Sequence, residues 1–170
     1  MAARFLPGNR LGLLCSGVEY FPALEAAIGA ARSEIFLETY IYSGDGTGQR
    51  ITQALCEAAW RGVAVQVLVD GFGARDMPDE FVEELKSAGV RLLVFRPEIF
   101  PFPWRRERLR RLHRKLVVVD DRVAFVGGIN IIDDFDTPRH KPLCAAISSC
   151  SGCWPSAPGW ASLTCSRAES

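Results

Sequence analysis

The chain alternates between two kinds of periodic segment. Short runs rich in β-branched and aromatic residues predict strands, and between them apolar residues recur at the spacing of an amphipathic helix. The predicted strands cover residues 11–15, 34–42, 63–70 and 90–95, and the predicted helices cover residues 20–31, 51–61 and 78–88. Because strands and helices alternate, the pattern predicts an α/β domain with a mostly parallel sheet flanked by helices.

A different pattern follows the proline-rich segment 97–103. Two apolar runs, 115–119 and 123–126, are separated by only three polar residues, 120–122, which predicts a β-hairpin. We therefore expect one domain over residues 9–136, with this hairpin at its end.

Residues 137–170 have another character. They contain few charges and many Ser, Cys, Pro and Trp residues, and we find no strand or helix period in them. Disordered segments are usually charged and poor in Trp and Cys, so that class fits badly. We expect an irregular tail unlike the domain, and out-of-frame translation is the interpretation that its composition favours. An unshifted reading frame in the nucleotide sequence would contradict this interpretation.

The net charge of the chain is zero, but its basic residues are concentrated. Residues 105–115 carry seven bases and one acid, whereas residues 1–100 carry thirteen acids and nine bases. A basic block suits phosphate groups or an anionic membrane surface, although a solvated helix face is the usual interpretation of such a block standing alone. Aromatic residues at 99–104 run directly into it, so a membrane interface and a core loop capped by arginines are equal alternatives.

The basic block ends in the pattern that carries the predicted chemistry. It reads H-x-K, four residues, D, six residues, G-G-x-N, and it begins at His113. On a strand, residues two apart project from the same face, so His113 and Lys115 are predicted to point together. An imidazole nitrogen can attack phosphorus, and an ammonium beside it can hold the non-bridging oxygens. The pattern therefore predicts phosphodiester chemistry, and its continuity with the basic block favours a phosphate-binding role for that block.

The other residues of the pattern receive different predicted roles. Asp120 has the opposite strand parity, so we expect it to orient a ring or close the hairpin turn, away from the substrate. Gly128 permits close backbone approach, and the Asn130 amide can donate to a phosphate oxygen. Arg111 and Arg114 complete the predicted phosphate-binding group.

We expect no metal and no other cofactor. The chain has only two histidines, which disfavours a multi-histidine centre, and Cys150-x-x-Cys153 has no second pair nearby for a zinc site. No stretch has the length of a membrane-spanning helix, and the N-terminus lacks a signal-peptide pattern. We therefore expect a cytoplasmic protein, at most peripheral on the inner face of the cell membrane.

The segments 37–74 and 113–131 resemble bacterial cardiolipin synthases of the phospholipase D superfamily, and the resemblance extends over residues 11–136. It implies that His113, Lys115 and Asp120 are the first of two catalytic motifs. It also implies a phosphatidyltransferase in which the motif histidine carries the phosphatidyl group as a phosphohistidine. A second motif's histidine then protonates the departing alcohol and activates the acceptor.

The resemblance further implies a phosphatidylglycerol-like phospholipid substrate at an anionic membrane surface. Because the chain has one motif, it looks like a truncated N-terminal half, and a homodimer is one way to supply the second motif. The alternatives are a homodimeric phosphodiesterase or nuclease, with nucleic acid the less favoured partner, and an inactive truncated fragment.

Three further polar residues have two equal interpretations each. Glu38 and Tyr40 lie on the same face of a predicted strand. That face is either an exposed edge or a site with a buried carboxylate near the end of the sheet. Asp70 ends a buried strand, where α/β sheets place site residues, but a carboxylate that closes a turn is equally good.

Overall fold

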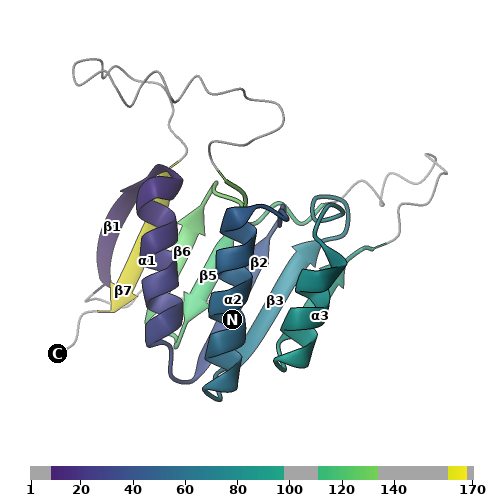
Figure 1. Ribbon diagram of the computed structural model, residues 1–170. Coiled ribbons are helices and arrows are strands. Elements are labelled where there is room, and N and C mark those ends of the chain that lie inside the picture. The colour runs from purple at the N-terminus through teal and green to yellow at the C-terminus, as the bar shows by residue number, and fades with distance from the viewer. Residues whose placement is uncertain (1–8, 98–110, 134–160, 168–170) are drawn as a thin grey trace, which may run out of the picture.

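The structure, a computed structural model, describes residues 9–97, 111–133 and 161–167. These residues form a sheet with three helices packed against it (Figure 1). The elements are β1 (Asn9–Cys15), α1 (Ser16–Ala30), β2 (Glu34–Thr39), α2 (Gly46–Trp60), β3 (Ala64–Asp70), α3 (Asp79–Ser87), β4 (Arg91–Phe95), β5 (Leu116–Val119), β6 (Val123–Gly127) and β7 (Ala161–Arg167). The α/β class is thus confirmed, and the predicted strands and helices lie at their expected places with ends that differ by a few residues.

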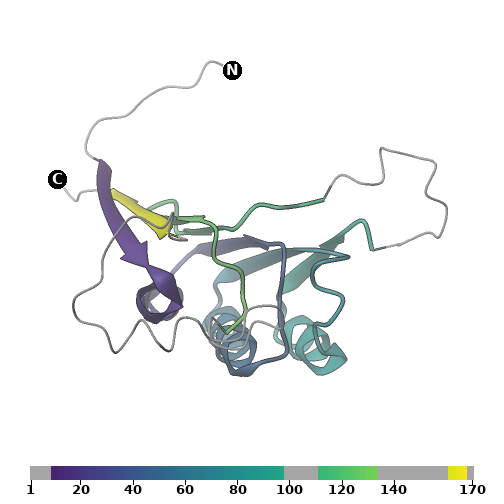
Figure 2. The same cartoon turned by 90° about the horizontal axis from the view of Figure 1, so that it is seen from above.

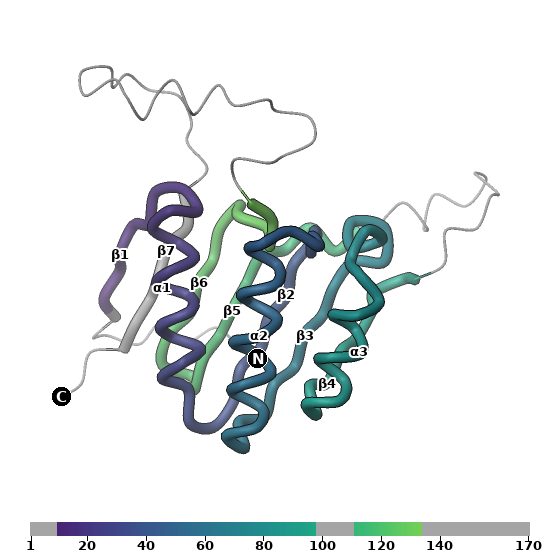
Figure 3. The backbone as a smooth tube through the Cα atoms, viewed as in Figure 1, coloured from purple at the N-terminus to yellow at the C-terminus, as the bar shows by residue number. Residues whose placement is uncertain are grey.

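The expectation of a mostly parallel sheet is wrong. The seven strands have the order β1-β7-β6-β5-β2-β3-β4, and only the β2-β3 and β3-β4 pairs are parallel. Parallel neighbours need a long crossover connection, which α2 and α3 supply for these two pairs. The hairpin β5-β6 is antiparallel, and β5 adds to β2 in the antiparallel direction (Figure 3). The sheet is therefore mixed, and its parallel part ends at β2.

All three helices cover the same face of the sheet (Figure 2). They bury the main hydrophobic core, which includes Leu24, Ile28, Ile35, Leu37, Ile51, Leu55, Val67, Leu85 and Val117. On the other face no helix packs within the described residues, and Phe36, Leu93 and Val126 are 36%, 42% and 51% exposed. The sheet is therefore flanked by helices, as predicted, and in the described part of the chain they all lie on one side.

The expectation of an irregular tail is wrong for its last described segment. Residues Ala161–Arg167 form β7, which pairs antiparallel with both β1 and β6. The signal was present in the sequence, because ASLTCSR alternates small or apolar residues with polar ones. Residues 134–160, including Cys150, Cys153 and His140, lie outside the described residues.

The predicted hairpin is confirmed. Arg122 N donates to Val119 O at 3.0 Å, the bond of a tight turn. Asp120 and Asp121, between them, have φ values of 53° and 54°. Aspartate tolerates this left-handed region better than most residues, so the two carboxylates suit the turn that joins β5 to β6.

Candidate active site

His113 and Lys115 lie in the extended segment that leads into β5, just before the strand begins. The structure brings them together at the ring of Tyr40. The His113 and Tyr40 ring centroids are 4.9 Å apart, and the Lys115 ammonium nitrogen lies 5.4 Å from the Tyr40 centroid. Lys115 Nζ also donates to the His113 carbonyl oxygen at 3.3 Å. The predicted pair thus gathers at one ring, contributed by a residue just beyond β2.

The two side chains have opposite exposure. His113 is exposed, whereas Lys115 is only 7% exposed. Burial lowers the pKa of Lys115, because the charged ammonium loses hydration. Among the residues that the structure describes, no carboxylate lies within ion-pair distance of this ammonium. An accessible imidazole beside a cation that lacks a counter-ion can receive a phosphate group.

Asp70 fixes the position of the segment that carries the histidine. This carboxylate is fully buried at the end of β3. Its Oδ1 accepts from the backbone N–H groups of Phe72 and Gly73, at 2.9 and 3.2 Å, and its Oδ2 accepts from Leu112 N at 2.7 Å. The turn interpretation of Asp70 is therefore the one that the geometry supports. Its bond to Leu112 also ties the residue before His113 to the end of β3.

Glu38, Arg111 and Arg114 lie near the segment that carries His113. Arg114 Nε lies 2.8 Å from Glu38 Oε2 as an ion pair, but its N–H does not point along a hydrogen bond. That buried oxygen has no hydrogen-bond donor within the described ranges. The arginine side chain is 64% exposed and that of Glu38 23%. The Arg111 guanidinium instead stacks 4.8 Å from the centroid of Phe72. Glu38 is thus a partly buried, ion-paired carboxylate beside the candidate site.

Asp120 does not join His113 and Lys115. It lies at the opposite end of β5, where it accepts from Arg32 N, Ser33 N, Ser33 Oγ and Glu34 N at 2.8–3.0 Å. Burial by itself raises the pKa of this carboxyl, but the donated hydrogen bonds outweigh it and hold the pKa well below its usual range. Strand parity predicted this separation, whereas the family motif had grouped Asp120 with the other two residues.

The loop after β6 returns the chain to β2. Asn130 Oδ1 accepts from Ile41 N at 3.0 Å, and Ile131 forms a parallel bridge with Tyr42. The Asn130 oxygen thus binds the backbone next to Tyr40, and its amide group donates no hydrogen bond to another described residue. Gly127 N donates to Lys115 O at 3.2 Å, and its half-buried neighbour Gly128 begins the turn toward Asn130. The G-G-x-N segment therefore contacts the backbone of Lys115 at one end and that of Ile41, next to Tyr40, at the other.

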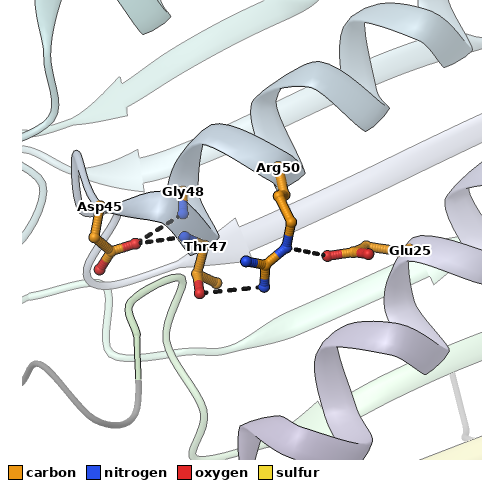
Figure 4. A network of polar contacts seen from close by, with 5 residues as sticks. All are labelled: Glu25, Asp45, Thr47, Gly48 and Arg50. Carbon is orange, nitrogen blue, oxygen red and sulfur yellow. Dashed lines mark hydrogen bonds and ion pairs between the residues drawn. The ribbon is translucent and has the colours of Figure 1, made fainter.

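Asp45 is a positioning residue that the sequence reasoning missed. Its Oδ1 caps α2 by accepting from Thr47 N and Gly48 N, both at 2.9 Å (Figure 4). Its Oδ2 accepts from Asp133 N at 2.8 Å, so one carboxylate joins α2 to the segment that follows Asn130. An aspartate directly before G-T-G at the start of a helical pattern is an N-cap signal that could have found it.

No cluster of three or more His, Cys, Asp or Glu side chains suited to a metal ion occurs in residues 9–97, 111–133 and 161–167. No helix in these ranges is long and apolar enough to cross a membrane. The aromatic segment 99–104 and the arginines between 105 and 110 lie outside the described residues, so their two interpretations stay predictions.

The fold is that of the phospholipase D superfamily. Nuc from Salmonella typhimurium, a phospholipase D family member, matches with a TM-score of 0.59 and 16% identity over 94% of this chain and 84% of that chain. NucT from Helicobacter pylori matches with a TM-score of 0.62 and 14% identity over 93% and 86%. At these identities the likeness concerns the fold alone.

The sequence comparisons identify the family more specifically than the likeness in fold does. The family described as cardiolipin synthase, PLD-like domain, matches residues 24–134. Cardiolipin synthase B of Escherichia coli (strain K12) is 45% identical over 130 residues, which is 76% of this chain and 32% of that protein. Cardiolipin synthase of Geobacillus kaustophilus is 37% identical over 127 residues, which is 75% and 25%. The chain belongs to this cardiolipin synthase family, as the resemblance predicted, and it spans a third or less of the length of these relatives.

Proposed function

We propose that the chain carries the nucleophilic half of a phosphatidyltransferase site. The observation that carries the proposal is the meeting at Tyr40 of an exposed imidazole and a buried ammonium that has no carboxylate partner in the described residues, in a member of the cardiolipin synthase family. The donor is a phospholipid of the phosphatidylglycerol type. The site works at an anionic membrane surface, where the protein is peripheral on the cytoplasmic side.

The proposed reaction has two displacements at phosphorus. In the first, a nitrogen of His113 attacks, the P–N bond forms, and the P–O bond to the headgroup alcohol breaks as that alcohol takes up a proton. In the second, an acceptor alcohol loses its proton and attacks, so a new P–O bond forms and the P–N bond breaks. His113 is thereby restored, and the phosphatidyl group has moved from one alcohol to another.

The surrounding donors stabilise the charge that develops on the phosphoryl oxygens. Lys115 supplies an ammonium, and the Asn130 amide supplies neutral donors. Arg111 adds a guanidinium from the rim. Arg114 adds another after it exchanges the Glu38 carboxylate for phosphate. Gly128 leaves room for the backbone to approach the substrate.

The departing alcohol needs an acid that this single motif does not contain. We propose that a second copy of the chain supplies it through its own motif histidine. A second candidate function, a homodimeric phosphodiesterase with similar chemistry on a phosphodiester of DNA, is compatible with the likeness in fold to Nuc and NucT. An inactive fragment is the third possibility, and the assay below separates the three.

The test uses the purified full chain with phosphatidylglycerol vesicles and, separately, with single- and double-stranded DNA. Lipid products are followed by mass spectrometry and the oligomeric state by light scattering. His113→Ala is compared with His140→Ala, because these are the chain's only two histidines. We expect phosphatidyl transfer by a dimer, lost only in His113→Ala, and an acid-labile phosphoramidate on the wild-type chain.

The other outcomes contradict the proposal. DNA cleavage without lipid transfer favours the phosphodiesterase. Inactivity of a folded dimer on both substrates favours the inactive fragment. Activity of a monomer, lost in His113→Ala, removes the requirement for a second motif.

A further inference from the structure

We propose that Tyr40 is a positioning residue of this site: its ring holds the His113 imidazole and the Lys115 ammonium in the arrangement that receives a phosphate group. The inference rests on the proposed function for the meaning of that arrangement. The arrangement itself is a property of the folded chain and is tested without any substrate.

The contacts of the ring carry the inference. The His113 and Tyr40 rings are tilted by 58° with their centroids 4.9 Å apart, within the range of attractive aromatic pairs. The Lys115 ammonium, 5.4 Å from the Tyr40 centroid, lies within the range of a cation–π contact. One ring therefore contacts the two side chains that the proposed reaction uses. Because Lys115 is buried, the π-face replaces part of the hydration that its ammonium has lost.

The ring is itself held in place by the turn that follows β3. A Cβ atom added to Gly73 would lie 2.2 Å from Tyr40 O and 2.9 Å from Tyr40 Cδ2, so only glycine allows the turn to pack this closely. Asp70 binds the N–H of Gly73 and also that of Leu112. The same carboxylate thus fixes both the turn that packs against Tyr40 and the residue before His113. The relative position of the Tyr40 and His113 rings is therefore fixed.

A merely structural aromatic residue is the competing explanation. It predicts that Tyr40 matters only through the stability of the fold. Against it, the ring is half-buried, and its hydroxyl makes no hydrogen bond to any residue in the described parts of the chain. The ring is then the part that acts, so phenylalanine should replace tyrosine and an aliphatic residue should not.

Histidine NMR gives a direct measurement. Selective labelling of the full chain yields two imidazole signals, and His140→Gln assigns them. We expect the His113 signal to carry a ring-current shift that persists in Tyr40→Phe and is lost in Tyr40→Leu. The matched control is Phe36→Leu, a partly exposed aromatic residue on β2 whose loss should leave the signal unchanged. In an active preparation, transfer should fall about 100-fold in Tyr40→Leu, the scale of a small misplacement, and stay within about twofold of wild type in Tyr40→Phe.

Three results would overturn the inference. An unchanged His113 signal in a folded Tyr40→Leu protein shows that the ring does not hold the imidazole. Equal defects in Tyr40→Phe and Tyr40→Leu assign the role to the hydroxyl. If Tyr40→Leu does not fold, a fluorinated phenylalanine at position 40 keeps the ring but weakens its π-face. An unchanged Lys115 titration in that protein then contradicts the cation–π contact. An inactive wild-type chain with the expected NMR pattern would refute the proposed function and leave the positioning intact.

Discussion

The charged groups at the two ends of β5 have opposite surroundings. At the start, the Lys115 ammonium is buried without a carboxylate partner in the described residues, and His113 beside it is exposed. At the end, the Asp120 carboxylate accepts four hydrogen bonds from residues 32–34. A buried charge without a counter-ion is costly and is available to a ligand, whereas a carboxylate saturated with hydrogen bonds holds the fold together. Within one short motif, the contrast separates the pair proposed to act on the substrate from the aspartate that holds the fold together.

The largest expected effect is on activity at the start of β5. Replacing the proposed nucleophile would remove the proposed covalent step, so His113→Ala should lower transfer by roughly 10⁴-fold or more. Because the His113 side chain is exposed, the substitution should change the protein's free energy of unfolding by only about 0.5 kcal/mol. Lipid product formation and urea unfolding measure the two quantities. A large loss of stability without loss of activity would reverse the comparison.

Next comes a loss of stability at the other end of the strand. Asp120→Ala removes the acceptor of four backbone and hydroxyl donors, so we expect it to destabilise the fold by ~2–4 kcal/mol. Asp120→Asn tolerates the positive φ and keeps one acceptor oxygen, so it should cost less. Both are compared with wild type by urea denaturation. Full stability of Asp120→Ala would mean that the four bonds are worth little.

The same carboxylate predicts an acid-sensitive stability. Its pKa is lower in the folded state than in the unfolded state, so its contribution is complete above the unfolded pKa of about 3.8 and is lost as the pH falls below it. The wild-type advantage over Asp120→Asn should therefore shrink between about pH 5 and pH 2. Denaturant midpoints measured across this range provide the test, and an advantage that does not depend on pH would contradict it.

The smallest expected effect is a gain of stability. Burial lowers the pKa of Lys115 in the folded state, so its ammonium opposes folding at neutral pH, and this penalty fades as the pH rises toward the ordinary lysine pKa of 10.5. Lys115→Met should then be more stable by about 1 kcal/mol at pH 7 and lose this advantage at alkaline pH. The variant should also lose transfer activity. Thermal unfolding at pH 7 and pH 10 measures the difference, and a less stable variant at pH 7 would show that the lysine stabilises the fold.

The sequence pattern predicted the local elements well. The segments from β2 to β6 lie at their expected places, and the hairpin with its aspartate turn is confirmed, because periodicity and turn residues act over a few positions. The sequence pattern predicted the directions of strand pairing less well. Alternation of strands and helices predicts parallel neighbours only where a helix intervenes, and it does not reveal how β5 and β7 add to the sheet.

The candidate site was predicted in part. The sequence spacing singled out His113 and Lys115, and the structure brings them together. Tyr40 was left between two interpretations, and the role of Asp70 in holding Leu112 was missed, because these contacts join residues far apart in the chain. Strand parity predicted that Asp120 lies away from His113 and Lys115, whereas the motif alone grouped the three. Parity succeeds because it describes the direction in which a side chain projects from a strand.

The double use of Asp70 has a consequence for how the site assembles. The hydrogen bond to Leu112 N spans 42 residues, so the histidine segment is docked only once β3 and β5 have both paired with β2, which lies between them in the sheet. The site then cannot form by a local turn of the chain ahead of the sheet. Its assembly should be as cooperative as folding itself, and the reactivity of one imidazole would report on the integrity of the whole sheet.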